Sequence, residues 1–325
     1  MIKKLQIYIG NSLNVYENLA TEKLLLDGVE KDSVILYLWQ NENTIVIGKN
    51  QNAWAECKTD AIKEDSVNLS RRLSGGGAVF HDIGNLNFTF IAPAENYDLA
   101  KQMLVIKKAC AMAGIETELS GRNDILANGR KFSGNAFYNS KGNSYHHGTL
   151  LISADMNKMG KYLTPSKSKL QAKGVKSVES RVVNLSELCP DLTVDKMRKN
   201  MILAAEEVYG LKTQQMSQIE FDKKQELTEL YGSWDYIYGT SIPADFSCEG
   251  RFSWGGMQIE FIVKNGTIEQ VQVFSDSMDF EISEKLQNAL NGQKFEKQII
   301  AEILFKKLEK EVAEDILSII ANAIF

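Results

Sequence analysis

Two adjacent arginines and three consecutive glycines form the stretch of this sequence best suited to bind an anion. The stretch, which we call the glycine loop, reads Arg71-Arg72-Leu73-Ser74-Gly75-Gly76-Gly77-Ala78-Val79-Phe80-His81-Asp82. Glycines let main-chain N–H groups approach a ligand, and a guanidinium offers phosphate oxygens a fixed fork of donors. The spacing fits neither a P-loop nor the G-x-G-x-x-G dinucleotide pattern. We therefore expect a phosphate or nucleotide site of another kind, with a plain tight turn between strands as the alternative.

Lys131 and Asp124 could complete a site for carboxylate activation. In that reaction a carboxylate attacks the α-phosphorus of ATP, so two anions must be held together by a cation, and Lys131 could supply it. A solvated lysine beside a turn is the alternative. Asp124 is a candidate Mg²⁺ ligand, because hard cations prefer carboxylate oxygen, although a turn or cap role fits equally well.

The three histidines are His81, His146 and His147. Neighbouring residues of a strand point to opposite faces, so at most one of the adjacent pair can face a ligand. Adenylation needs no histidine base. We expect structural or substrate-positioning roles for all three.

A basic segment lies between positions 158 and 181, where Glu179 is the single acidic residue. Its cations are Lys158, Lys161, Lys167, Lys169, Lys173, Lys176 and Arg181. Such a run is often a solvated face. Gly174 and several serines also suit a loop that contacts phosphates or an acidic partner.

Composition narrows the class of protein. A chain of 325 residues with 44% hydrophobic and 24% charged residues predicts a large globular domain with a small one attached. A net charge of −5 gives no electrostatic case for nucleic-acid binding. The N-terminus is too short and strand-like for a signal peptide, so we expect a cytoplasmic protein without membrane spans. The four scattered cysteines, with no C-x-x-C pair, predict reduced thiols.

The apolar patterning predicts a mixed α/β, α+β-type fold. Apolar runs and alternation predict strands over 5–9, 34–39, 44–48, 85–91, 115–119 and 145–152. Spacings of three and four predict helices over 14–26, 55–65, 99–112, 194–209, 219–231, 280–290 and 299–324. Hairpins are expected between 34–39 and 44–48, at Asn128-Gly129, and between 251–263 and 268–274. The stretch Gly239–Asp245 is the expected boundary between domains 1–240 and 246–325.

Five ordered motifs closely resemble those of the two-domain bacterial lipoate-protein ligases. They are the glycine loop, Asn87-Phe88-Thr89-Phe90, Ser120-Gly121-Arg122-Asn123-Asp124, Arg130-Lys131-Phe132-Ser133-Gly134 and His146-His147-Gly148-Thr149-Leu150-Leu151. The resemblance continues through 173–182 and 251–256, and so covers nearly the whole chain. It implies a catalytic domain of the biotin/lipoate-ligase type, related to class II aminoacyl-tRNA synthetases, followed by a small accessory domain.

The resemblance also implies a reaction and a set of contacts. Lipoate and Mg-ATP would give lipoyl-AMP and pyrophosphate, and the lipoyl group would then pass to one lysine of an acceptor protein. The implied ATP contacts are Arg72, Gly77, Ala78, Val79, Phe80 and Lys131. The expected lipoate contacts are Lys131, Ser74 and His147. The loop that would close over the adenylate includes Lys173, Gly174, Ser180 and Arg181. Asp124 would bind the metal. The turn between Asp124 and Lys131 is shorter than in some relatives.

Partners and alternatives follow from the same resemblance. The expected acceptors are lipoyl-acceptor domains of 2-oxo acid dehydrogenase acyltransferase subunits, the glycine-cleavage H protein, or both, with the enzyme a monomer. A transferase of the same fold would instead use a cysteine thioester without ATP, but no cysteine lies in the glycine-loop or Lys131 motifs. A sensor that only binds lipoate or nucleotide is the other alternative. We also expect the C-terminal domain to move about 239–245 when the adenylate forms, to exclude water.

Overall fold

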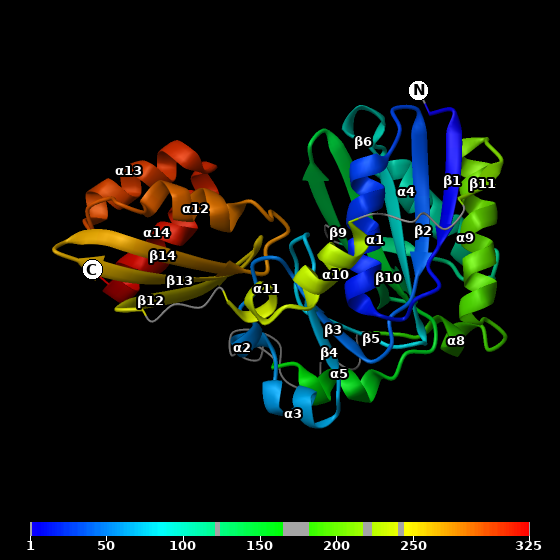
Figure 1. Cartoon of the computed structure of the whole chain (residues 1–325), viewed down its shortest axis with the longest axis horizontal. Helices are drawn as coiled ribbons and strands as arrows, with labels where there is room; N and C mark the ends of the chain where they lie inside the picture. The colour runs from blue at the N-terminus through cyan, green and yellow to red at the C-terminus, as the bar shows by residue number, and fades with distance from the viewer. Residues whose placement is uncertain (1, 121–123, 165–181, 217–222, 240–243, 325) are drawn as a thin grey trace.

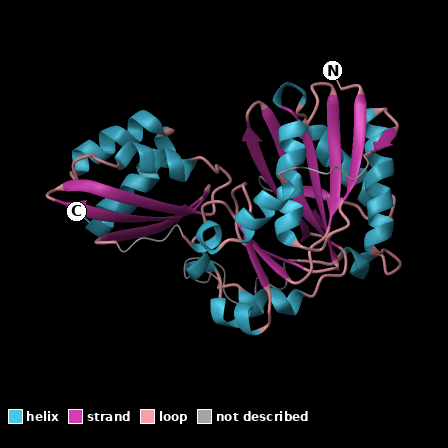
Figure 2. Ribbon diagram, in the orientation of Figure 1, coloured by secondary structure: helices cyan, strands magenta, loops and turns pink. Residues whose placement is uncertain are grey.

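The computed structural model describes residues 2–120, 124–164, 182–216, 223–239 and 244–324 (Figure 1). Over these ranges the chain forms a large lobe around an extended sheet and a small lobe in which helices cover a three-stranded sheet (Figure 2). The large lobe's last described helix, α11 (Trp234–Tyr238), is followed at Phe246 by the first strand of the small lobe. Within the described ranges, no helix combines the length and apolar character needed to span a bilayer.

An eight-stranded sheet forms the centre of the large lobe. Its spatial order is β11 (Thr213–Gln215), β1 (Lys4–Ile9), β2 (Ser33–Trp39), β6 (Asn85–Pro93), β10 (Asn143–Leu151), β9 (Arg130–Ser140), β8 (Asp124–Ala127) and β7 (Glu118–Ser120). Strands β11, β1 and β2 run parallel, whereas the pairings from β2 through β6, β10, β9 and β8 to β7 are antiparallel. The predicted strand over 115–119 is thus confined to the short β7.

Helices cover both faces of this sheet (Figure 1). On one face, α4 (Leu99–Ala111) and α9 (Val194–Tyr209) bury side chains such as Leu36 and Phe88. On the other, α1 (Val15–Gly28), with α10 (Lys224–Gly232) beside it, buries Tyr37 and Trp39. Because successive strand residues point to opposite faces, β2 is buried along its whole length. The sequence predicted α1, α4 and α9 closely, and α10 begins at Lys224, the earlier part of its predicted range being largely outside the described residues.

The predicted hairpin between 34–39 and 44–48 is wrong. Strand β2 pairs with β1 and β6, while β3 (Thr44–Ile47) pairs with β4 (Asn68–Arg71) and β5 (Val79–His81) in a separate three-stranded sheet. The connection between them cannot fold back, because Asn41 is fully buried and bonded to Asn18 and His81. This second sheet carries the glycine loop, which joins β4 to β5.

Two predicted helices are each divided in the structure. The range 55–65 overlaps α2 (Ala53–Glu56) and contains α3 (Thr59–Glu64). The two are separated at Cys57 and Lys58, which bridge to Leu163 and Tyr162 at the end of α5 (Met156–Tyr162). The range 299–324 contains α13 (Lys297–Lys307) and α14 (Lys310–Ile324), which pack as a pair. In both ranges, contacts with other parts of the fold override the local helical pattern. A short helix, α8 (Leu185–Leu188), precedes α9.

The small lobe packs three helices on the sheet β12–β13–β14. Its strands are β12 (Phe246–Phe252), β13 (Gly255–Lys264) and β14 (Thr267–Ser275), and α12 (Ile282–Leu290) precedes the other two helices. The range 251–263 was predicted as one strand, but a turn before Gly255 divides it. The hairpin at Asn265-Gly266 is confirmed, with φ of 53° and 73°, as is the one at Asn128-Gly129, with φ of 50° and 70°.

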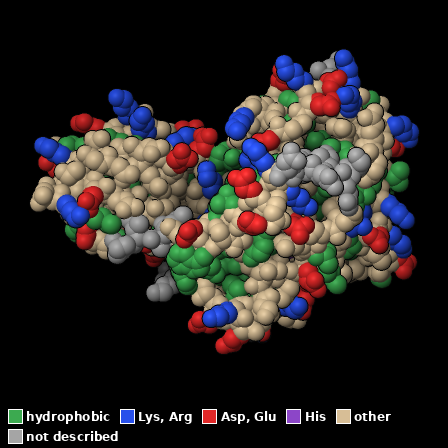
Figure 3. All heavy atoms as spheres, viewed as in Figure 1, with side chains coloured by type: hydrophobic (Ala, Val, Ile, Leu, Met, Phe, Trp, Pro, Cys, Tyr) green, Lys and Arg blue, Asp and Glu red, His purple; other side chains and the backbone are tan. Residues whose placement is uncertain are grey.

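The two lobes meet at the glycine loop. The main-chain N–H of Gly76 donates to the Ser277 carbonyl at 2.9 Å, and a Cβ built on Gly75 would lie 2.2 Å from that same oxygen. Asn50 Nδ2 donates to the Phe280 carbonyl at 2.9 Å, and the Phe280 ring lies 4.8 Å from that of Tyr138. On the face drawn in Figure 3, acidic and basic side chains are interspersed over both lobes.

Candidate active site

A cavity of about 160 Å³ lies between the large sheet and the glycine loop. Its walls come from α1, β2, β3, β5, β6, β9, β10 and the glycine loop itself. The lining includes Arg72, Gly76, Gly77, Ala78, Val79, Lys131 and His147, so most of the expected contact residues share one cavity. Among the described expected residues, Phe80, Ser74 and Asp124 do not line it. The Phe80 side chain is buried and packs near the Tyr162 ring, 5.8 Å between centroids.

Arg72 holds the glycine loop in shape. Its Nη2 donates to the carbonyls of Gly75 (2.7 Å) and Gly77 (2.8 Å), its Nη1 to the Val46 carbonyl (3.1 Å), and its Nε reaches Ser74 Oγ (3.1 Å). Burial lowers the pKa of Arg72 to about 10, so the side chain stays charged at neutral pH. The fork that the sequence suggested for phosphate thus binds main-chain carbonyls.

The carbonyl bonds of Arg72 also orient the amides of the loop. In a trans peptide the C=O and N–H point in opposite directions. Holding the Gly77 carbonyl therefore turns the N–H of Ala78 away from Arg72. Gly76 adopts φ of 90°, a conformation that favours glycine, and so lets the loop make this turn.

Arg71 has a similar structural role on the other side of β4. Its Nη1 donates to the carbonyls of Lys49 at 2.9 Å and Gln51 at 2.6 Å, and its Nη2 bonds the Ile237 carbonyl. These bonds tie the glycine loop to α11, the last described helix before the small lobe. The charge of Arg71 is buried under carbonyl oxygens rather than offered to the cavity, which it does not line.

Lys131 brings a cation to the cavity from β9. Its Nζ lies 2.7 Å from Asp124 Oδ1 across the β8–β9 hairpin, and both side chains are about one-third exposed, at 37% and 36%. A Cβ built on Gly134 would lie 3.2 Å from this amine, so glycine leaves it room. The structure thus brings Lys131 and the glycine loop to the same cavity. Asp124 reaches the site through Lys131 and is not part of the lining.

Buried polar side chains continue from Ser74 away from the glycine loop. Ser74 Oγ lies 2.7 Å from His147 Nε2, and His147 Nδ1 lies 2.9 Å from Glu22 Oε1. Thr89 donates to the same Glu22 oxygen at 2.7 Å and accepts from Trp39 Nε1 at 3.1 Å. Trp39 and His147 both line the cavity, so this chain connects its deeper wall to the glycine loop.

Sequence reasoning did not identify Glu22, Asn87 or the hydrogen-bond partners of His81 as site residues. Glu22 falls at the helical spacing of the apolar positions Leu19 and Leu26, and it is 2% exposed. An acid in the apolar stripe of a predicted helix is a signal that could have identified it, because buried carboxylates need partners. His81 is also buried, and burial, helped by the charge of Arg72, lowers its pKa to about 3, so its ring is neutral.

The expected loop over the adenylate falls outside the described residues: Lys173, Gly174, Ser180 and Arg181 are all in the range 165–181. The chain after that range is described, and the Val183 N–H donates to the Lys131 carbonyl at 2.9 Å. The chain therefore emerges from the basic segment beside Lys131.

In the described part of the chain, the side chains around the cavity include no cysteine. Over the described ranges, no cluster of three His, Cys, Asp or Glu side chains could hold a metal ion. All four cysteines are free, and none lines the cavity. Burial raises the pKa of Cys57, Cys110 and Cys248 to about 12, which leaves these thiols un-ionised and poorly nucleophilic.

Comparison with known proteins gives the geometry a context. Residues 14–206 match a family model described as the lipoyl protein ligase A/B catalytic domain, and residues 241–320 match one described as the bacterial lipoate protein ligase C-terminus. The chain is 39% identical over 307 residues to a protein of Psychrobacter cryohalolentis named lipoate-protein ligase A, an alignment that covers 91% of each chain.

Solved structures give the same picture. LipL1 of P. falciparum, solved in complex with lipoate, superposes with a TM-score of 0.86 at 31% identity, covering 98% of this chain and 99% of that one. A bipartite lipoate protein ligase of Thermoplasma acidophilum, described with its E2 lipoyl domain, superposes with a TM-score of 0.64 at 23% identity. It covers 75% of this chain and 99% of its own, and at this identity the likeness concerns the fold alone.

Proposed function

The chain belongs to the family of bacterial lipoate-protein ligases, and from this premise we propose that its cavity activates lipoate with ATP and passes the lipoyl group to an acceptor lysine. The observation that carries the proposal is the placing of Lys131 and the glycine loop in one cavity. A cation and main-chain donors then face the space where a carboxylate and a triphosphate would meet.

In the first step the carboxylate oxygen attacks the α-phosphorus and pyrophosphate leaves. Lys131 offsets the repulsion between the two anions and adds transition-state stabilisation as charge moves onto the α-phosphate. Amides of the glycine loop, oriented by Arg72, support the nucleotide from the opposite wall. Arg72 therefore contributes mainly by fixing the loop, while Gly77, Ala78 and Val79 supply contact surface.

The hydrocarbon chain of lipoate would lie along the apolar part of the cavity wall, with its carboxyl end in the same cavity as Lys131. Leu19, Val46 and Trp39 give this part of the cavity an apolar lining that suits a hydrocarbon chain. Ser74 and His147 bond each other here, so they shape the wall as part of the chain that includes Glu22.

Mg²⁺ would accompany ATP, with Asp124 as its candidate protein ligand. Its carboxylate is partly exposed and is paired with Lys131. One carboxylate fits Mg²⁺, which commonly keeps water and phosphate oxygens for most of its shell. The ion would supply charge neutralisation on the leaving pyrophosphate. Asp124 would otherwise orient Lys131, as it does here.

The acceptor is proposed to be a lipoyl domain of a 2-oxo acid dehydrogenase acyltransferase subunit, the glycine-cleavage H protein, or both. The archaeal ligase of the same fold is described with an E2 lipoyl domain, which supports the first choice by analogy. The enzyme is proposed to act as a monomer, without nucleic acid or membrane.

The test is pyrophosphate release on mixing the enzyme with lipoate and ATP, followed by mass spectrometry of lipoyl domain and H protein. We expect lipoate-dependent release and a lipoylated acceptor lysine. Acceptor modification without ATP would instead support the thioester transferase. Binding of lipoate and ATP with no pyrophosphate released would support a sensor.

A further inference from the structure

His81 and Asn87 place buried polar nitrogens without partners on the wall of the cavity. His81 is 4% exposed and Asn87 is 1% exposed, and both residues line the cavity. Among the described residues, neither His81 Nε2 nor Asn87 Nδ2 has a hydrogen-bond partner. Buried donors are normally paired, so two unpartnered nitrogens on residues that line one cavity are candidates to bind a ligand atom.

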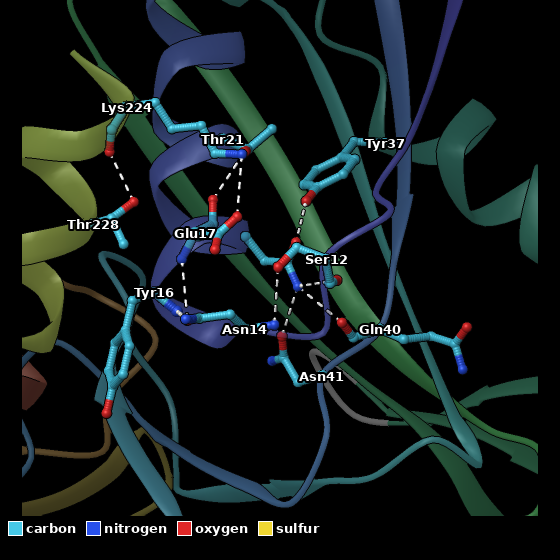
Figure 4. Close-up of polar contacts among 11 residues, drawn as sticks. Ser12, Asn14, Tyr16, Glu17, Thr21, Tyr37, Gln40, Asn41, Lys224 and Thr228 are labelled. Atoms are coloured by element: carbon cyan, nitrogen blue, oxygen red, sulfur yellow. Dashed lines mark hydrogen bonds and ion pairs between the residues drawn. The ribbon is translucent and has the colours of Figure 1, made fainter. Parts of the chain in front are cut away.

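A relay from α1 fixes the tautomer of His81. Asn18 Nδ2 donates to the main-chain carbonyls of Ser12 at 3.0 Å and Gln40 at 2.8 Å, which identifies it as the nitrogen of that amide. The two hydrogens of this nitrogen are shared with a third acceptor, Asn41 Oδ1 at 2.9 Å. Asn18 Oδ1 accepts from the Tyr37 hydroxyl at 3.0 Å. Figure 4 shows Ser12, Gln40, Asn41 and Tyr37 converging on this point.

Because the amide oxygen of Asn41 accepts from Asn18, the amide nitrogen of Asn41 is the atom that faces His81. Asn41 Nδ2 lies 3.1 Å from His81 Nδ1, so Nδ1 must accept. The ring is neutral, as shown above, and its one proton is therefore on Nε2. The relay thus presents a neutral N–H donor to the cavity.

Asn87 supplies a second donor. Its Oδ1 accepts from Asn85 Nδ2 at 2.8 Å, and its Nδ2 is left without a partner among the described residues, as is Asn85 Oδ1. Asn87 lies opposite Trp39 on β2 and opposite Thr149 on β10, in the middle of the sheet face that forms the cavity wall. Two neutral donors with no acceptor of their own suit an oxygen that only accepts.

We propose that His81 Nε2–H and Asn87 Nδ2–H bind the acyl oxygen of the substrate and act as an oxyanion hole when the acyl group is transferred. This inference rests on the proposed function. In the transfer step the lysine nitrogen attacks the carbonyl carbon, a C–N bond forms, and the carbonyl π pair moves onto this oxygen. As C=O reforms, the C–O bond to AMP breaks with its pair on the phosphate oxygen, and the ammonium proton passes to water.

Neutral donors suit this oxygen better than a second cation would. The oxygen belongs to a carboxylate before activation, to the uncharged carbonyl of the anhydride afterwards, and to an oxyanion during transfer. Lys131 already supplies positive charge at the carboxylate, and a second cation would stabilise the ground-state carboxylate further and so weaken its attack on phosphorus. A preorganised neutral donor strengthens as charge develops and needs no proton transfer. Asn18 and Asn41 are positioning residues for it.

The test measures affinity for two adenylate analogues by calorimetry. Lipoyl sulfamoyl adenosine keeps the acyl oxygen, whereas an alkyl ester of AMP has a methylene in place of the carbonyl. For His81→Phe and Asn87→Leu we expect a loss of about tenfold in affinity for the first analogue, equivalent to one hydrogen bond, and little change for the second. His81→Gln, which retains an N–H donor, should recover part of the loss.

Single-turnover transfer from preformed lipoyl-AMP should slow by about 10²–10³-fold in His81→Phe. The matched control is Gln102→Leu, which removes another buried amide with an unpartnered nitrogen, located on α4 against the opposite face of the sheet. It should leave both affinities unchanged. Thermal melts identify any variant that does not fold, and the remaining variant decides.

An equal loss of affinity for both analogues would overturn the proposal, because the donors would then bind a phosphate oxygen or serve only to stabilise the fold. Loss of neither would overturn it as well. If the wild-type enzyme makes no lipoyl-AMP, the proposed function fails. If it does and the variants do not discriminate between the analogues, only this inference fails.

Discussion

The two faces of the eight-stranded sheet are built from the same strands but bury different kinds of side chain. On β6, Leu86, Phe88 and Phe90 point to the α4–α9 face and join a mostly apolar core, in which Gln102 and His146 are buried polar exceptions. The residues between them, Asn87 and Thr89, point to the α1 face. On the α1 face, polar residues occupy the positions that line the cavity. This face therefore offers groups that can bind a ligand but buries fewer apolar side chains there.

The adjacent histidines of β10 show the same contrast. His146 has its ring among those of Phe88, Phe90 and Phe137, with centroids 5.3, 6.0 and 5.1 Å away. His147 bonds Ser74 and Glu22 in the cavity wall. Identical residue types one position apart therefore lie among aromatic rings on one face and in the polar wall of the cavity on the other, where we propose that His147 helps to position the substrate.

The largest difference between the faces should come from Lys131→Ala. We expect turnover to fall by about 10²–10³-fold or more, since this cation supports the reacting centre, while the free energy of unfolding changes little at a part-exposed site. Steady-state pyrophosphate release and urea denaturation measure the two quantities. Lys141→Ala, at the exposed β9–β10 turn, is the control and should retain activity. A variant that loses lipoate affinity alone while keeping turnover would contradict the role given to Lys131.

On the α4–α9 face, Phe88→Ala should do the reverse. Phe88 is fully buried, so we expect the free energy of unfolding to fall by about 3–5 kcal/mol, with kcat of the folded protein little changed.

Thr89→Val, one residue away, should lower the free energy of unfolding by about 1–3 kcal/mol, because Glu22 and Trp39 lose their hydrogen-bond partner. It should also raise KM for lipoate. Equal effects of both substitutions on KM would remove the distinction between the faces.

The pH dependence of stability should come from both faces. Burial lowers the pKa of His81 and of His146 to about 3, below the ordinary value of 6.5. The unfolded state then binds more protons below pH 6.5, so the free energy of unfolding falls as pH drops from about 6.5 toward 3 and is level above that window. The slope is at most about 1.4 kcal/mol per pH unit for each histidine. In His146→Phe the slope between pH 6.5 and 5 should decrease, and an unchanged slope would contradict the assignment.

The smallest effect concerns the small lobe, whose Ser277 carbonyl accepts a hydrogen bond from the glycine-loop N–H of Gly76. We expect that contact to break and the lobe to move when lipoyl sulfamoyl adenosine binds, because the anhydride must be protected from water. Small-angle scattering with and without the analogue measures the change. Phe280→Ala, which removes the ring contact with Tyr138, should shift the free enzyme's profile toward the bound one. Superimposable profiles in all three samples would rule out the motion.

Local chemistry in the sequence determined much of this molecule. Period-3.6 and period-2 patterns predicted α1, α4, α9 and β10, and Asn-Gly pairs predicted both tight hairpins, because helices and two-residue turns depend on neighbours along the chain. The glycine loop and Lys131 could be identified as a site because glycine and lysine have unusual conformational and electrostatic properties wherever they occur. These residues indicated the class of reaction before any strand was placed.

Only the tertiary structure decided how distant segments meet. In the tertiary structure β3 lies in a second sheet and not beside β2, and the guanidinium groups of Arg71 and Arg72 bind carbonyl oxygens. Glu22 and the hydrogen-bonded pair Asn18–Asn41 lie behind residues that line the cavity. The physical reason is that a buried polar group is stabilised by whatever partner lies within about 3 Å, whatever its distance along the chain. Residues 18, 41 and 81 have no local pattern in common, so their hydrogen bonds exist only once the layers have packed.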